Sequence, residues 1–164
     1  MRDARRKPVA SLRATAIRML ARRDYPRAAL EARLVARGGE LAEVARTLDD
    51  LERLGYLSDA RFAQALVAQK AGRFGKRAIA HALRERRIEP TVAREALAAL
   101  AGNDEIASAK AVWARRFRAS PADERERARQ IRFLIARGFS VATALTIVGR
   151  DVAAADRASD FEAD

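Results

Sequence analysis

The sequence has 164 residues and a formal net charge of +11, with no cysteine and one histidine, His81. Lack of Cys excludes disulfides, thiolate nucleophiles and Cys-ligated zinc, and a single His excludes a His-pair metal site. Alanine, the strongest helix former, supplies 39 residues, against 8 Gly and 4 Pro. The composition therefore predicts an all-helical protein without a catalytic site, metal or cofactor, rather than an enzyme.

Apolar periodicity and stop signals predict nine helices in chain order. The helices are expected over 9–23, 26–37, 40–54, 59–71, 75–87, 90–100, 104–118, 122–137 and 140–149. The third helix carries one apolar stripe, made of Leu41, Val44, Ala45, Leu48 and Leu51. Four glycines follow periodic runs and suit the left-handed position after a helix: Gly38, Gly55, Gly102 and Gly138.

Three helix starts have recognisable signals. Ser58 is a good N-cap for the helix that begins at residue 59, and Pro90 can open the helix over 90–100. The segment 120–123 (SPAD) indicates Ser120 as an N-cap, Pro121 in the first turn and a carboxylate close behind.

The chain also repeats itself at a period of about fifty residues. The anchors Leu34, Leu83 and Leu134 lie 49 and 51 residues apart, and each is followed three residues later by Arg. Apolar residues recur 17 before, 10 after and 14 after the anchors: Ile17, Leu66, Phe117, Val44, Ala93, Ala144, Leu48, Leu97 and Val148. This phase predicts an elongated, curved array of three tandem three-helix repeats. Tyr56 and Leu57 are expected to fill the joint between the first two.

The net charge is unevenly divided among the predicted parts of the chain. The predicted parts are a basic tail (1–8), repeat 1 (9–57), repeat 2 (58–101), repeat 3 (102–150) and an acidic tail (151–164). Segments 1–8, 9–60, 61–101, 102–150 and 151–164 carry +3, +1, +6, +5 and −4. The bias of 29 Arg over 4 Lys suits a surface that binds phosphates or carboxylates. The alternative, the codon composition of a GC-rich genome, does not by itself explain this separation. The positive middle favours a polyanionic partner, either nucleic acid or an acidic protein surface.

Two basic stripes are the candidate contact surfaces. At 100° per residue, Arg77, Arg84 and Arg87 fall within about 40° of Arg73, with Lys76 beside them. In the third repeat Arg125, Arg129 and Arg132 form a similar stripe opposite Leu134. The alternative is that both stripes are ordinary solvated helix faces.

Other motifs favour structural roles. Gly72–Arg77 (GRFGKR) lacks the spacing of a phosphate loop and indicates a turn between helices, with Phe74 packed inward. His81 and the pair Asp49-Asp50 suit a helix surface. Tyr56, Phe62, Trp113, Phe133 and Phe139 are spaced as core anchors, with base stacking as the alternative for one or two of them.

The chain contains three motifs, Gly55–Ala63 (GYLSDARFA), Gly72–Leu83 and Arg129–Ser140 (RQIRFLIARGFS). Together they resemble the RecX family of regulatory proteins. Gly55–Ala63 (GYLSDARFA) is similar to the family's signature junction, Gly72–Leu83 with Arg87-Ile88 to its continuing segment, and Arg129–Ser140 (RQIRFLIARGFS) to its C-terminal motif. Together the segments cover most of residues 10–150 in the family's order. Tyr25-Pro26-Arg27 replaces the Ser that usually precedes Arg at the second helix, and Lys70 stands where Arg is common.

The resemblance implies a non-catalytic modulator of the RecA recombinase. Such proteins bind the RecA–DNA filament along its groove and mainly inhibit its ATPase and strand-exchange activities. The resemblance also implies three tandem three-helix repeats. Direct contact with DNA and a monomeric state are expected.

The alternative is a helical protein that binds nucleic acid alone, through a helix-turn-helix around Gly138. In either case no apolar run is long enough to span a membrane, and we expect a cytoplasmic protein.

Overall fold

The computed structural model describes residues 11–100, 105–117 and 119–149, and within these ranges it contains helices and no strand. The helices are α1 (Leu12–Leu20), α2 (Arg27–Val35), α3 (Leu41–Arg53), α4 (Asp59–Lys70), α5 (Lys76–Glu85), α6 (Pro90–Ala98), α7 (Glu105–Arg116) and α8 (Glu124–Ala136). A last helix covers 141–149. All nine predicted helices are thus present, most of them a few residues shorter than expected. The two predicted tails and Gly102 lie outside the described residues.

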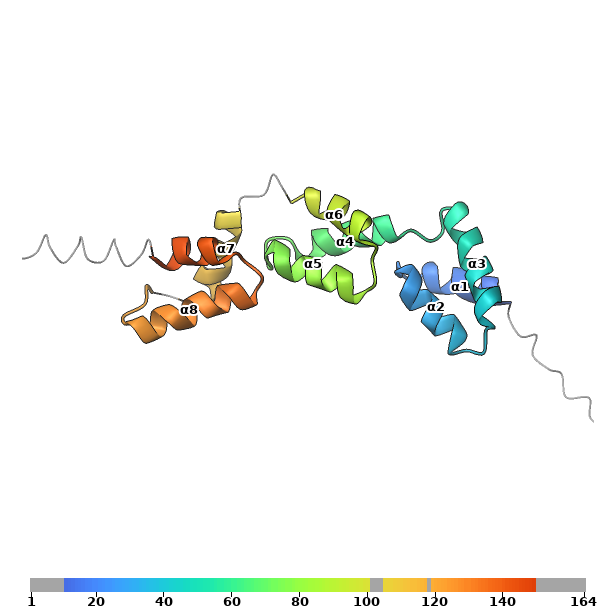
Figure 1. Cartoon of the computed structure of the whole chain (residues 1–164), viewed down its shortest axis with the longest axis horizontal. Helices are drawn as coiled ribbons and strands as arrows, with labels where there is room; N and C mark the ends of the chain where they lie inside the picture. Colours follow the sequence, from blue (N-terminus) through green and yellow to red (C-terminus); the bar gives the residue numbers. More distant parts are fainter. Residues whose placement is uncertain (1–10, 101–104, 118, 150–164) are drawn as a thin grey trace, which may run out of the picture.

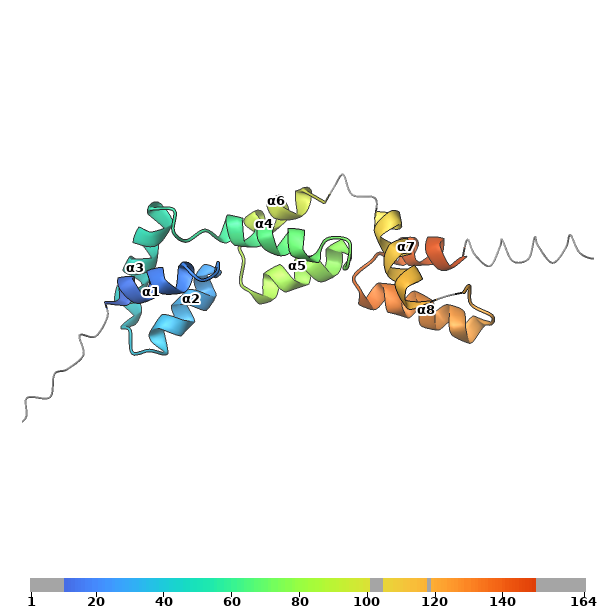
Figure 2. The same cartoon turned by 180° about the vertical axis from the view of Figure 1, so that it is seen from behind.

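The helices form three groups that follow one another in a row, slightly arched at the middle group (Figures 1 and 2). The first group contains α1–α3, the second α4–α6, and the third α7, α8 and the last helix. Each group has a buried apolar cluster of its own, within residues 16–57, 63–97 and 109–148 respectively. The all-α array of three-helix repeats is therefore confirmed. Among the described residues, no helix is long and apolar enough to cross a bilayer.

The three anchor leucines define one turn that occurs in every repeat. Leu34, Leu83 and Leu134 are fully buried. The carbonyl oxygen of each accepts a hydrogen bond from the N–H five residues later, from Gly39 (3.1 Å), Ile88 (3.2 Å) and Phe139 (3.2 Å). The period found in the sequence is thus the period of a buried leucine in the last turn of the second helix of each repeat.

The residue four positions after each anchor takes a left-handed backbone conformation. Gly38 and Gly138 have φ of 91° and 87°, and Arg87 takes the same role with φ of 56°. An L-residue with a side chain is strained in this conformation because its Cβ crowds the backbone. The predicted helix over 75–87 therefore extends two residues too far, since α5 ends at Glu85 and Arg87 stands in the turn that follows.

Two glutamates cap the third helices of the first two repeats. Glu40 precedes α3 and accepts hydrogen bonds from the N–H groups of Ala42 and Glu43, both 3.0 Å long. These bonds lower the pKa of Glu40 from its usual value. Glu89 precedes α6, and hydrogen bonds from the side chain and backbone of Thr91 lower its pKa as well. Ionised Glu thus takes the capping role that Ser, Thr or Asp usually has at helix starts.

Two of the three predicted helix starts are confirmed. The Ser58 side chain accepts a hydrogen bond from the N–H of Arg61 (3.2 Å), and Pro90 is the first residue of α6. The prediction for Ser120 and Pro121 is wrong, because α8 begins at Glu124 and Asp123 caps it by accepting from the N–H of Glu126 (2.7 Å). Asp is as good an N-cap as Ser, and here it stands three residues nearer the helix.

The joint between the first two repeats is polar, contrary to the expectation for Tyr56. Leu57 is buried, but it packs within the first repeat's cluster, and Tyr56 is 51% exposed. The Asp59 carboxylate crosses the joint and accepts a hydrogen bond from the backbone N–H of Arg27 (2.7 Å). The Arg61 guanidinium pairs with Asp24 (3.2 Å) and donates to the carbonyl oxygens of Gly55 (3.2 Å) and Tyr56 (3.0 Å).

Asp59 replaces a cap that the second helix lacks. Pro26 is the N-cap residue of α2, which begins one residue later than expected, and it offers no side-chain acceptor. The Arg27 guanidinium bridges Asp49 (2.7 Å) and Glu52 (2.6 Å) of α3. Burial works against the charge of Arg27, but these two carboxylates outweigh it and raise its pKa. The lack of the usual Ser before the Arg that opens the second helix is thus compensated by a carboxylate from the next repeat.

We predict that Arg87→Gly stabilises the protein. Glycine removes the strain of the left-handed conformation, about 1–2 kcal/mol. Part of this gain in stability is lost, because glycine also raises the conformational entropy of the unfolded chain. A net gain of about 1 kcal/mol corresponds to a melting temperature about 2–4 °C higher for a chain of this size. Arg84→Gly, within α5, is the control that also removes one Arg charge, and it should lower the melting temperature. A lower melting temperature for Arg87→Gly would contradict the assigned turn.

Candidate binding surface for a polyanion

The predicted contact residues all have exposed side chains. They are Arg73, Lys76, Arg77, Arg84, Arg87, Arg125, Arg129 and Arg132. The five residues of the second repeat form no ion pair with any part of the chain that the structure describes. Their charges are therefore available to an external anion.

Only part of the second-repeat stripe is a helix face. Arg77 and Arg84 lie seven residues apart on α5, which places them on one side about two turns from each other. Ile79 and Leu83 of the same helix are fully buried. Arg73 stands in the turn before α5, and Arg87 in the left-handed turn after it. The helical wheel applied helix geometry to Arg73, in the turn before the predicted helix over 75–87, and to Arg87, but only Arg77 and Arg84 share a helix face.

The second and third repeats meet through their backbones at two glycines. The N–H of Gly75 donates to the carbonyl oxygen of Arg137 (2.9 Å), and the N–H of Arg77 donates to that of Gly138 (3.2 Å). A Cβ on Gly75 would lie 2.2 Å from the oxygen of Gly138, and a Cβ on Gly138 would lie 2.4 Å from the Cβ of Ala78. Neither position has room for a side chain, so the two turns touch directly.

This joint gathers four arginines from two repeats. Arg73 lies with Arg115 and Arg116 of α7 and with Arg137, which follows α8. They surround a hollow of about 220 Å³ whose other lining residues are Val112 and Phe133. No carboxylate of the described residues lines it, so the hollow concentrates positive charge.

Aromatic rings hold one of these arginines in place. The Arg137 guanidinium carbon lies 5.1 Å from the centre of the Phe133 ring and 5.5 Å from that of Phe74. Lys70 approaches the Phe74 ring as well, at 4.6 Å. Such cation–π contacts order a guanidinium without neutralising it. Phe74 thus packs at the joint, in agreement with the prediction that its side chain points inward.

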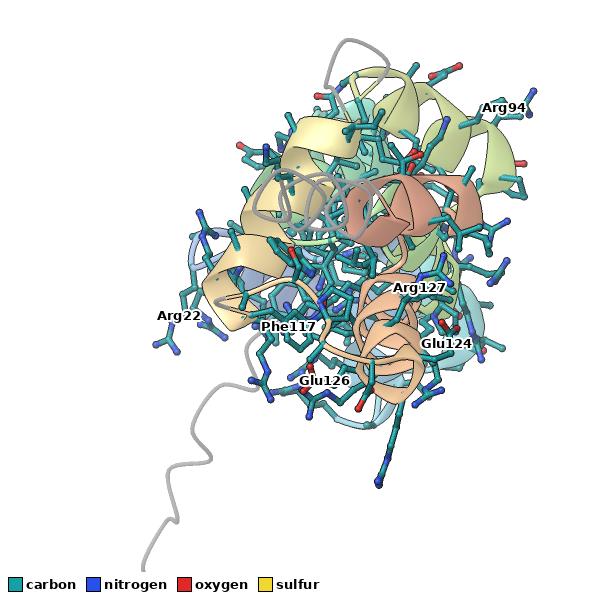
Figure 3. The ribbon with its side chains drawn as sticks, turned by 90° about the vertical axis from the view of Figure 1, so that its left-hand side faces the viewer. Arg22, Arg94, Phe117, Glu124, Glu126 and Arg127 are labelled. Atoms are coloured by element: carbon teal, nitrogen blue, oxygen red, sulfur yellow. The ribbon has the colours of Figure 1, made fainter. Side chains whose placement is uncertain are left out.

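The stripe on α8 is partly neutralised. Arg125, Arg129 and Arg132 line one hollow of about 400 Å³ together with Asp123 and Glu126. Arg129 pairs with Glu126 at 3.2 Å. On the same helix Glu124 pairs with Arg127 at 3.4 Å, and the two side chains lie next to each other in Figure 3. The structure therefore brings the three predicted residues together, but in a surface of mixed charge.

The remaining candidates have ordinary partners. His81 is exposed, with its Nδ1 3.5 Å from Glu85. Asp49 and Asp50 pair with Arg27 and Arg53 respectively. Trp113 is buried and donates its indole N–H to Gln130 (2.8 Å). No cluster of three or more His, Asp or Glu side chains suited to a metal ion occurs within residues 11–100, 105–117 and 119–149.

The fold and the surface together define a class: an elongated helical-repeat protein whose second and third repeats carry exposed arginines, most of them without an ion pair among the described residues. Family models described as "RecX, second three-helix domain" and "RecX, third three-helix domain" match residues 58–97 and 103–144.

Named relatives agree with this match. The regulatory protein RecX of Herminiimonas arsenicoxydans is 41% identical over 130 residues, 79% of this chain and 85% of the relative. That of Ralstonia nicotianae is 40% identical over 150 residues, 92% and 91% of the two chains. The crystal structure of RecX from Lactobacillus salivarius has the same fold, with a TM-score of 0.71 at 17% identity over 85% of this chain and 93% of that one. The chain belongs to the RecX family of regulatory proteins.

The glycine contact gives a local prediction. Gly75 has a φ of −76°, which alanine adopts freely, so Gly75→Ala acts only through its collision with Gly138. The variant should expose the Arg77 amide, which hydrogen exchange measured by NMR would detect as a large loss of protection.

Gly72→Ala is the matched control in the same turn. Gly72 has a φ of 71°, and a Cβ added to it would have nothing within 4 Å, so alanine there adds strain without a clash. Its Arg77 amide should stay protected. Equal protection of that amide in both variants would show that the two repeats do not touch at Gly75.

Proposed function

We propose that this chain binds the RecA–DNA filament and mainly inhibits its ATPase and strand-exchange activities. Membership of the RecX family, whose relatives carry the name of regulatory proteins, supports a regulatory role. The observation that carries the proposal furthest is the run of exposed arginines along a row of repeats, most of them without an ion pair among the described residues.

The shape of the chain suits a long partner. A row of repeats meets a filament along its length, and a nucleoprotein filament repeats negative phosphates and carboxylates at regular intervals. Guanidinium groups bind both kinds of anion bidentately. One chain that lies across neighbouring recombinase subunits would hinder the addition or favour the loss of subunits. The effect is produced by binding, so the chain needs no catalytic residue or cofactor. The proposal also takes the chain to act as a monomer in the cytoplasm.

The arginine surfaces of the second and third repeats contribute unequally to the proposed contact. Arg77 and Arg84 are exposed and unpaired among the described residues, whereas Arg129 on α8 shares its charge with Glu126. The second repeat and the joint that contains Arg73 are therefore the proposed main contact, and Arg125 and Arg132 extend it. Part of this surface meets the DNA of the filament directly.

The alternative, a stand-alone helix-turn-helix protein around Gly138, has less support. The helix that follows this turn, residues 141–149, contains no charged residue that could reach phosphates or base edges. The turn itself is occupied, because the carbonyl oxygen of Gly138 accepts from Arg77. Salt-sensitive, sequence-preferring binding to duplex DNA without any recombinase would favour this alternative.

The proposal predicts a charge-reversal effect confined to the second repeat. Arg77→Glu with Arg84→Glu should lower the affinity for RecA filaments, so that about tenfold or more protein is needed to inhibit the ATPase, because each reversal replaces an attraction to an anion by a repulsion. Stability should change by less than about 0.5 kcal/mol, since both side chains are exposed.

The matched control reverses two arginines of the first repeat's α3. Arg46→Glu with Arg53→Glu changes the net charge equally and should inhibit nearly as well as the wild type. Circular dichroism must show native helix content for both variants. Equal inhibition by the two double variants would refute the assignment of the contact surface to the second repeat, and wild-type protein that leaves the ATPase unchanged would refute the function.

A further inference from the structure

The first repeat carries a basic pocket that its near-neutral composition hides. The pocket lies between the ends of α1 and α2 and measures about 660 Å³. Four arginines line it: Arg18 and Arg22 from the end of α1 and the turn after it, and Arg33 and Arg37 from the corresponding part of α2. All four side chains are exposed, and Figure 3 shows Arg22 extending away from the body of the protein.

No carboxylate of the described residues lines this pocket, because the acidic groups of the repeat are used elsewhere. Asp49 and Glu52 hold Arg27, Asp50 holds Arg53, and Asp24 holds Arg61. The four pocket arginines form no ion pair with the described residues. The positive charge of the pocket is thus not offset by an ion pair within the described residues, although Glu43 lines the neighbouring hollow with Arg18 and Arg37.

Helix dipoles account for only a part of this clustering. Arginines near helix C-termini are stabilised by the negative ends of the helices, and Arg37 donates to the carbonyl oxygen of Arg33 (3.1 Å) in this way. Each helix end is equivalent to about half a negative charge. Two helix ends therefore offset about one of the four guanidinium charges, and the rest stays uncompensated.

The side chain of Tyr25, on the wall of the pocket, lies in the positive field of neighbouring arginines. The guanidinium carbons of Arg23 and Arg33 lie 4.5 and 5.4 Å from the centre of its ring. A hydrogen bond with Arg23, with added attraction from the charges of Arg33 and Arg37, lowers the pKa of the Tyr25 phenol. The pocket therefore favours negative charge on any group placed beside Tyr25.

The lining chemistry identifies the class of ligand. Guanidinium forks match phosphate oxygens, and the hydroxyl of Thr15, which Arg18 reaches at 3.3 Å, adds a further polar group. Met19, Ala21 and the ring of Tyr25 provide an apolar wall against which a sugar or base can lie. The volume exceeds that of one phosphate group. A flexible strand can fold successive phosphates into such a hollow, whereas duplex DNA, with a persistence length of about 150 base pairs, meets only its rim.

We propose that this pocket of the first repeat binds the sugar–phosphate backbone of single-stranded nucleic acid. The site lies outside the two repeats proposed to carry the filament contact and needs no recombinase. Its test is therefore independent of the proposed function.

The test uses the full chain and a fluorescein-labelled oligothymidylate, with binding followed by anisotropy over a series of salt concentrations. Arg22→Gln with Arg33→Gln is the pocket variant, because Arg18 and Arg37 also line a neighbouring hollow that includes Glu43, whereas Arg22 and Arg33 do not. We expect an affinity at least about tenfold weaker, since hydrogen bonds to charged groups are lost. The salt dependence should also fall by about 1.4 in log–log slope, at about 0.7 per phosphate contact.

Arg13→Gln with Arg46→Gln is the matched control. Both are exposed arginines of the same repeat, and neither lines this pocket or the neighbouring hollow of the described surface. The control should keep the wild-type affinity and slope. Arg22→Lys with Arg33→Lys retains the charges and the fold while it loses the bidentate geometry, so it should bind more weakly than wild type with an unchanged slope.

Two outcomes would overturn the inference. Equal affinity of the pocket and control variants for the single strand would show that the pocket takes no part in binding. A loss confined to a duplex of the same length would show that the pocket recognises duplex phosphates and not a single strand. If the Gln pair fails to fold by circular dichroism, the Lys pair decides, and wild-type affinity in that pair would contradict bidentate binding of phosphate.

Discussion

The shape of this protein depends on how little its repeats share. Every apolar cluster of the described residues is closed within one three-helix unit, so neighbouring units meet through narrow polar or backbone contacts. Between the first two, these contacts include the hydrogen bond from Arg27 to Asp59 and the Arg61–Asp24 pair. Between the last two, Gly75 and Gly138 bring the backbones together. Units joined in this way extend in a row instead of burying one another.

The joints also determine which charges meet. Arg73 is far in sequence from Arg115, Arg116 and Arg137, and it joins them only because Gly75 touches Gly138. The packing of two turns, and not the face of one helix, thus creates the most concentrated positive hollow of the proposed contact surface. In the first repeat the joint has the opposite effect, because Asp59 and Asp24 bond to groups at the joint and leave Arg18, Arg22, Arg33 and Arg37 without an ion pair within the described residues.

Much of the fold is predictable from local signals. The leucine anchors, the glycines after them and the apolar phase recur with so constant a spacing that the nine helices and three repeats follow from the sequence. The errors lie where tertiary contacts decide. Tyr56 is an aromatic residue of the kind that often packs in a core, but it stands in an exposed turn. Pro26 does not start α2 alone, because Asp59 completes the cap of that helix.

The candidate site was less predictable than the fold. The exposure of Arg77 and Arg84 follows from the buried positions of Ile79 and Leu83 on the same helix. The contribution of Arg115, Arg116 and Arg137 could not be predicted, because no local pattern shows that two turns about sixty residues apart touch. Net charge per segment misled in the first repeat, since a sum near zero does not distinguish mixed charges from segregated ones.

Small-angle X-ray scattering of the monomeric chain tests the central claim, an extended row of repeats, most directly. A compact globule of this length has a radius of gyration of about 15 Å. Three units joined end to end should give a clearly larger radius and an asymmetric distance distribution with a long tail. A radius near 15 Å with a symmetric distribution would show that the repeats fold back on one another, and the extended contact surface would not exist.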